Sequence, residues 1–98
     1  MIRHVAIFNW TDNASTAEIA AFAAGLSAMP DNVPGILRYE HGDDLQLSDR
    51  TADYVVVADF ATVEDYRAYS SHPYHLAFIA DLLRPITASA TRVQYHVA

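Results

Sequence analysis

The chain contains no cysteine and no lysine, and only three of its 98 residues are glycine. The absence of cysteine excludes disulfides, thiolate nucleophiles and cysteine-ligated metals. Without lysine, the positive charge rests on six arginines scattered along the sequence, and the formal net charge is −6. No basic stripe that could follow a phosphate backbone is present, so nucleic acid binding is not expected.

Long apolar runs and charged residues are also scarce. No segment is long enough to span a membrane, and residues 1–4 lead into a strand-like segment without the features of a signal peptide. We therefore expect a cytoplasmic protein that does not enter a membrane. Charged residues make up 18% of the chain and hydrophobic residues 52%, which indicates a folded protein with some surface covered by a partner. The length predicts one domain over residues 1–98.

The first half of the chain predicts a strand, a helix and a second strand. Residues 2–10 are rich in β-branched and aromatic side chains, which is typical of a strand. Ser15 and Glu18 form a capping-box pattern that predicts the start of a helix. Residues 30–35 hold two prolines and a glycine and are expected to end it. A second strand is predicted over residues 36–40, followed by a polar loop from His41 onward.

The second half predicts a strand, a broken helix and a closing strand. Residues 54–60 are apolar on both faces, as in a central strand that is covered on two sides. A helix is predicted to begin after Thr62, to break at residues 70–72, and to restart at Pro73 and run to about Leu83. Residues 91–97 are predicted to form the last strand.

This order of elements is the βαββαβ plan of a ferredoxin-like α+β fold, which puts both helices on one face of a four-stranded sheet. The other sheet face would then be bare, although the strands carry apolar residues on both sides. An exposed apolar face of that size favours a partner. We therefore expect a homodimer in which two sheets face each other as a dimeric α+β barrel.

Chemistry concentrates in the stretch from Tyr66 to Ile79. Pro73 suits the first position of a helix, with His72 as its N-cap. His75 then shares a helix face with Phe78, so its imidazole is expected to point inward, with Tyr69 just across the break. An inward imidazole beside a phenol is either a hydrogen-bonded core pair or an acid–base couple. The spacing of His72 and His75 could suit a metal, but no acidic residues converge on them, and no metal site is predicted.

Other polar residues receive simpler interpretations. His4 shares its strand face with bulky apolar residues and is expected to face the same space as His75. His41 and His96 are most simply exposed or at an interface. The acidic residues of the long loop (Asp43, Asp44, Asp49 and Asp53) are interpreted as solvated.

The sequence resembles the stress-responsive α/β-barrel (Dabb) family along nearly its whole length. The segment from Tyr69 to His75, YSSHPYH, is similar to the family's Tyr-x-x-His-Pro-x-His signature. His4 in the first strand, residues 33–36 (VPGI) before the second, and residues 59–60 (DF) at the end of the third also match. Membership implies a dimeric α+β barrel, in agreement with the expectation from the pattern of elements.

The resemblance also implies candidate site residues. One plant enzyme of the family closes a linear polyketide by an aldol reaction without a cofactor, and its catalytic tyrosine and histidine fall on Tyr69 and His75. One histidine in the pocket of that enzyme corresponds to His4 of this chain. A second pocket histidine is replaced here by Tyr54, and a pocket tyrosine is replaced by Leu26. The residues expected to contact a substrate are His4, Phe22, Leu26, Tyr54, Val56 and Phe78.

Two hypotheses of different class follow. The first is a cofactor-free cyclase or aldolase acting on a polyketide-like β-dicarbonyl compound, with His75 as base and Tyr69 as the partner of the oxyanion. The second is a non-catalytic dimer that binds a small apolar ligand or acts in a stress response. An open cavity beside His75 favours the first, and side chains that fill this space favour the second. A cofactor-free monooxygenase is a weaker alternative, suggested by the adjacent Asn9 and Trp10 alone.

Overall fold

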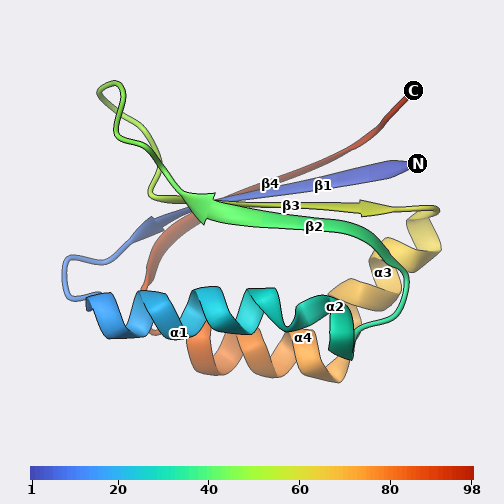
Figure 1. Ribbon diagram of the computed structural model, residues 1–98, viewed down its shortest axis with the longest axis horizontal. Helices are drawn as coiled ribbons and strands as arrows, with labels where there is room; N and C mark the ends of the chain where they lie inside the picture. The colour runs from blue at the N-terminus through green and yellow to red at the C-terminus, as the bar shows by residue number, and fades with distance from the viewer.

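Four antiparallel strands form one sheet in the order β2-β3-β1-β4, and all helices lie against one of its faces (Figure 1). The computed structural model describes residues 1–98. The strands are β1 (Ile2–Trp10), β2 (Ile36–Asp43), β3 (Tyr54–Phe60) and β4 (Thr87–His96). This arrangement confirms the ferredoxin-like α+β fold that the order of elements predicts.

Five helical segments form the second layer. They are α1 (Thr16–Ser27), α2 (Met29–Asn32), α3 (Val63–Ser71), α4 (Pro73–Phe78) and the π-helical η1 (Ile79–Leu83). The predicted capping box opens α1, because Ser15 Oγ accepts from Glu18 N at 3.1 Å and Glu18 Oε1 accepts from Ser15 N at 3.1 Å. The Thr62 hydroxyl caps α3 in the same way by accepting from the backbone N–H of Asp65.

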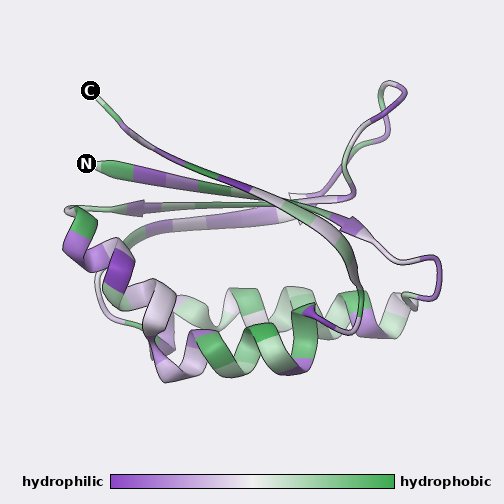
Figure 2. Cartoon of the chain, turned by 180° about the vertical axis from the view of Figure 1, so that it is seen from behind, coloured by the Kyte–Doolittle hydropathy of each residue, from purple (hydrophilic) through white to green (hydrophobic).

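The core fills the space between the sheet and the helices. Figure 2 shows hydrophobic residues in both layers. Phe22 and Leu26 of α1 are buried against the inner faces of β1 and β3, whose buried residues alternate along each strand. The largest fully buried side chains are Phe22, Phe60, Leu26, Met29, Ile86 and Val33.

The opposite face of the sheet has no covering layer within the chain (Figure 1). Its middle is apolar, with Val5, Ile7, Val55, Val57 and Val93, and Val93 retains 53% of its accessible surface. The patch has the composition of a contact surface rather than of a solvated sheet face.

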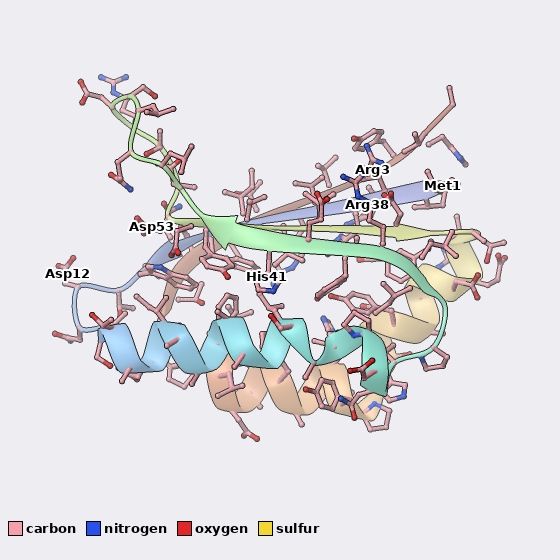
Figure 3. The ribbon with its side chains drawn as sticks, viewed as in Figure 1. Met1, Arg3, Asp12, Arg38, His41 and Asp53 are labelled. Carbon is pink, nitrogen blue, oxygen red and sulfur yellow. The ribbon has the colours of Figure 1, made fainter.

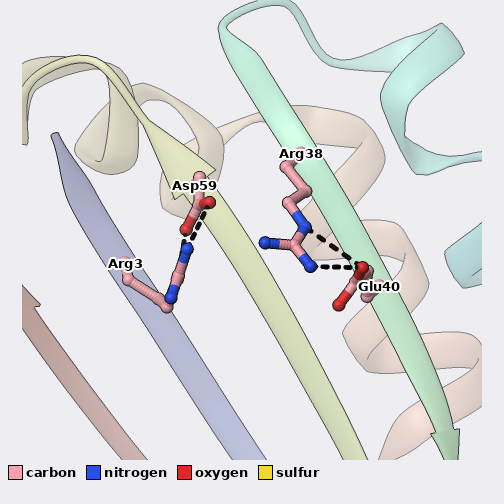
Figure 4. A network of polar contacts seen from close by, with 4 residues as sticks. All are labelled: Arg3, Arg38, Glu40 and Asp59. Carbon is pink, nitrogen blue, oxygen red and sulfur yellow. Dashed lines mark hydrogen bonds and ion pairs between the residues drawn. The ribbon is translucent and has the colours of Figure 1, made fainter. Parts of the chain in front are cut away.

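Charged residues border this apolar patch at the end of the sheet near the chain termini. Arg3 binds Asp59 through two hydrogen bonds of 2.7 and 2.9 Å, and Arg38 binds Glu40 at 2.6 Å (Figure 4). The Arg3 guanidinium holds the pKa of the Asp59 carboxyl below its usual range, chiefly through this hydrogen bond. The pair ties β1 to β3 by a bidentate contact.

Three predicted boundaries are wrong. β2 continues through Asp43, because its ladder with β3 extends to the pair Asp43–Tyr54. β4 begins at Thr87 rather than residue 91, since Thr87 already pairs with Trp10 beyond a bulge at Ala88 of β4. Pro30 does not end the first helical region but lies inside the short helix α2, at an early position where its missing N–H costs no hydrogen bond.

Candidate functional site

A cavity of about 290 Å³ opens between the sheet and the break that separates α3 from α4. This volume is at the small end of the range found for ligand sites. Eleven of its fifteen lining residues are hydrophobic, and the four others are His4, Ser70, His75 and Arg92. The cavity is therefore an apolar space with a few polar groups, as ligand sites commonly are.

The helix break determines how His75 is held. His72 caps α4, because its Nδ1 accepts from the backbone N–H of Tyr74 at 3.0 Å, and Pro73 occupies the first helical position. Ser70 precedes this cap, and its carbonyl oxygen lies 3.0 Å from His75 Nδ1. A carbonyl can only accept, so Nδ1 of His75 carries the proton. Nε2 makes no hydrogen bond and keeps its lone pair.

Burial keeps His75 neutral. Desolvation lowers its pKa from the ordinary value of 6.5, the hydrogen bond to Ser70 opposes this, and the positive charge of Arg92 lowers it further. A neutral imidazole with a free Nε2 is the form that can accept a proton from a ligand.

Tyr69 is buried at 3% exposure and packs against the His75 ring, with ring centroids 4.3 Å apart. No hydrogen bond joins the two side chains. The Tyr69 hydroxyl instead lies 2.9 Å from the hydroxyl of Tyr39, on β2. Burial raises the pKa of Tyr69 to about 12, so the phenol stays protonated at neutral pH and can donate a hydrogen bond.

His4 forms a second buried imidazole in the same wall. The side-chain amide of Gln94 donates to His4 Nδ1 at 2.9 Å, which places the proton of the neutral ring on Nε2. Desolvation, aided by the positive charge of Arg92, lowers the pKa of His4 to about 4. His4 is therefore a neutral hydrogen-bond donor, in contrast to His75, whose Nε2 is an acceptor.

Most of the predicted site residues lie together in the cavity wall. These are His75, Tyr69, His4, Leu26, Val56 and Phe78. Phe22 and Tyr54 do not line it, which corrects the expectation for these two. Phe22 is fully buried with its ring edge-on to Trp10 and Tyr54, and the Tyr54 hydroxyl is held by His41 Nδ1 at 2.6 Å.

Nine wall residues are not among the predicted site residues, and four of these nine carry a polar side-chain group: Tyr39, Tyr66, Ser70 and Arg92. Tyr39 and Arg92 lie within the predicted strands, but a residue's place in a strand does not by itself show that its side chain borders a cavity. The position of Ser70 depends on the geometry of the helix break, for which the sequence carries no specific signal.

Two other interpretations are corrected. His41 is not an exposed residue, since it points from β2 toward α1 (Figure 3) and bonds both Tyr54 and Ser27. Asp53 is not merely solvated, because its Oδ2 accepts from the backbone N–H of Trp10 at 2.7 Å.

The pair Asn9–Trp10, which suggested a monooxygenase, is divided between the two faces of the sheet. Asn9 bonds Ser89 on the exposed side at 3.0 Å, and Trp10 packs into the aromatic core. Neither side chain lines the cavity. The pair does not form a polar–aromatic site beside a ligand.

No group of three or more histidine, cysteine, aspartate or glutamate side chains is placed to hold a metal ion. No helix is both long and apolar enough to cross a membrane.

Comparison with known families gives a match over residues 2–97 to the stress responsive A/B barrel domain, Dabb. The chain belongs to this family. A dimeric ferredoxin-like protein of unknown function from Thermobifida fusca is 34% identical, with a TM-score of 0.90 over 98% of this chain and 90% of that one. No protein of curated function matches the sequence.

Two enzymes share the Dabb chain's fold at lower identity. A hydroxynitrile lyase from Passiflora edulis is 18% identical, with a TM-score of 0.87 over 99% of this chain and 93% of that one. SnoaB, a cofactor-independent oxygenase from Streptomyces nogalater, is 20% identical, with a TM-score of 0.77 over 99% of this chain and 92% of that one. At these identities the likeness concerns the fold alone.

Proposed function

We propose that the protein is a cofactor-free enzyme that removes a proton next to a carbonyl group, with His75 as the base. The observation that carries this proposal is the bond from His75 Nδ1 to the Ser70 carbonyl. It fixes the tautomer that leaves Nε2 free, on a residue that lines an open cavity. The open space favours an enzyme over a barrel packed solid with side chains.

The chemistry of a polyketide-like β-dicarbonyl compound fits these groups. His75 Nε2 takes the acidic proton between two carbonyls, and the electrons of the broken C–H bond move onto one carbonyl oxygen. The Tyr69 hydroxyl donates to this developing enolate. The enolate carbon attacks a second carbonyl of the same chain, and the alkoxide that forms recovers the proton from the His75 imidazolium. No atom or electron is gained or lost in this aldol cyclisation.

Turnover of a defined substrate panel tests the proposal. The panel comprises linear 3,5-dioxo acids, their N-acetylcysteamine thioesters and, because a relative of the same fold is a hydroxynitrile lyase, mandelonitrile. The native protein is expected to convert at least one compound, and His75→Ala to lower kcat/KM roughly 10²- to 10⁴-fold. His96→Ala is the matched control, because His96 is exposed and outside the cavity wall. No turnover, or turnover that His75→Ala leaves unchanged, would refute the enzymatic role.

The second candidate is a non-catalytic dimer that stores or senses a small apolar ligand in a stress response. The observation in its favour is that the hydroxyl of Tyr69 is already bound to Tyr39 and makes no bond to His75. Ligand binding without turnover of any panel compound is the result that this candidate predicts.

A homodimer and a cytoplasmic location are part of the proposal. The apolar outer face of the sheet supports the dimer, as does the description of the 34% identical protein from Thermobifida fusca as dimeric. Two copies that meet through this face would bury the Val93 and Ile7 side chains. A dimer of this kind is the α+β barrel expected from the sequence.

A further inference from the structure

The cavity wall holds one permanent cation and no acid. Arg92 is the only one of the fifteen lining residues with a fixed charge, and none of them is aspartate or glutamate. The structure contains two ion pairs, Arg3–Asp59 and Arg38–Glu40, and neither involves Arg92. The guanidinium therefore has no carboxylate partner within the chain.

The register of the sheet explains why Arg92 lies at the cavity. On β4, Arg92 is paired with Ala6 of β1, and paired residues of antiparallel strands share a face. Ala6 lines the cavity as well. A methyl side chain leaves space beside the arginine stem, whereas a larger residue at this position would fill it. Arg92 itself is exposed, which places it at the rim of the cavity rather than in its depth.

Arg92 shares the cavity wall with His4, His75 and Tyr69. The positive charge of Arg92 contributes to the lowered pKa values of His4 and His75 and opposes the rise that burial causes in the pKa of Tyr69, so all three lie within its electrostatic reach. Because Gln94 fixes the proton of His4 on Nε2, that ring adds a neutral donor beside the cation. The rest of the wall is apolar and includes Leu26, Phe78 and Leu83.

We propose that the ligand of this cavity is an apolar chain that ends in a carboxylate, and that Arg92 binds the carboxylate. The inference rests on the proposed function in that it takes this cavity as the substrate site, and it specifies the substrate class as a free acid. A guanidinium presents paired N–H donors that match the two oxygens of a carboxylate. The apolar tail then occupies the cavity, and the carbon next to a carbonyl group comes to lie beside His75.

Calorimetric titration of the native protein with octanoate and with octanamide tests this proposal. The two probes have the same length and differ in charge at the head group. Octanoate is expected to bind roughly tenfold to hundredfold more tightly, as is usual for a hydrogen-bonded charged pair. Arg92→Gln is expected to remove this difference by weakening octanoate alone, and Arg92→Lys to restore part of it. Arg84→Gln removes the same charge from an exposed residue outside the cavity and is expected to change neither affinity.

The comparison of the two probes on native protein needs no variant, so a folding defect in Arg92→Gln does not affect it. Equal affinity for octanoate and octanamide, or no binding of either probe, would overturn the proposal. The same holds if Arg84→Gln weakens octanoate as much as Arg92→Gln does. Arg92-dependent binding of octanoate combined with no turnover of the panel would leave this inference intact and refute the enzymatic role. Turnover of the neutral thioesters of the panel, combined with no preference for octanoate over octanamide, would refute this inference and leave the enzymatic role intact.

Discussion

The hydroxyl groups of Tyr39 and Tyr69 lie 2.9 Å apart and join β2 to α3 inside the cavity wall. Burial raises the pKa of both phenols, so the contact is a neutral hydrogen bond between two protonated groups. It gives the Tyr69 hydroxyl a fixed position. Tyr39 thereby holds Tyr69 in its place in the cavity wall. His75 contacts Tyr69 only by packing of the two rings.

We predict that Tyr39 and Tyr69 are energetically coupled. Tyr39→Phe and Tyr69→Phe should each lower the free energy of unfolding by about 1 kcal/mol, because each removes one hydroxyl and leaves the other buried without its partner. The double variant should lose clearly less than the sum of the two. Urea denaturation of the four proteins measures the coupling. Tyr95→Phe, at an exposed residue with 47% accessibility, is the control. Strictly additive losses would show that the two hydroxyls do not interact.

Stability should fall as the pH is lowered from 6.5 to about 4, because the pKa of His4 drops from its ordinary value of 6.5 to about 4 on folding. Within this window the unfolded chain binds a proton that the folded chain does not, and the free energy of unfolding decreases. The lowered pKa values of His41 and His75 act in the same direction. The Asp59 carboxyl contributes mainly below this window, since its folded pKa is depressed.

Urea denaturation at pH 7 and pH 4.5 measures this dependence. His4→Gln is expected to be less stable than the native protein at pH 7 but to lose less on acidification. His96→Gln, at an exposed position, should keep the native dependence. An identical fall in stability for the native protein and His4→Gln would contradict the assignment to His4.

Gly25 allows close contact between α1 and the helix that carries Phe78. A Cβ at this position would come within 2.8 Å of Leu82 Cδ1 and 2.9 Å of the Phe78 ring. Gly25→Ala should therefore destabilise the protein by about 1 kcal/mol net, since overpacking outweighs the gain in helix propensity. At Gly42 a Cβ meets nothing within 4 Å, so Gly42→Ala is the matched control. Thermal or urea unfolding that shows Gly25→Ala to be stabilised would contradict this close packing.

The outer face of the sheet should form the dimer interface. The native protein is expected to show twice the 10.8 kDa chain mass by light scattering at micromolar concentration. Val57→Glu, in the middle of this face, should shift the mass to that of one chain, because it places a charge where an apolar contact is needed. Ala21→Glu, on the exposed side of α1, should remain dimeric. A monomeric native protein would refute the dimer.

The fold could be predicted because its signals are local and repeated. The limits of β3 and the capping box at Ser15 follow from alternation and from a known cap pattern, and both are found in the structure. The predicted β2 and β4 are too short, because polar residues at their ends are stabilised by pairing with strands distant in sequence. Propensity alone cannot detect such pairing.

Part of the site could be predicted, because some of its signals are also local in the sequence. His75 and Tyr69 flank a helix break that the sequence marks with Pro73, so their proximity was foreseeable. The role of Tyr39 was not, since a register shift between Ile36 and Arg38 interrupts the alternation of β2 and its partner Tyr69 is 30 residues away in the sequence. Phe22 was expected in the cavity wall and lies in the core instead, because four aromatic rings close around it.

The protonation of His75 decides whether this cavity contains a base. We propose long-range ¹H–¹⁵N correlation of the imidazole nitrogens across a pH titration, with the His75 signals assigned by their loss in His75→Ala. The expected result at pH 7 is a neutral ring with the proton on Nδ1 and none on Nε2, titrating with a midpoint below 6.5. A ring protonated on Nε2, or an imidazolium at pH 7, would contradict the proposed base.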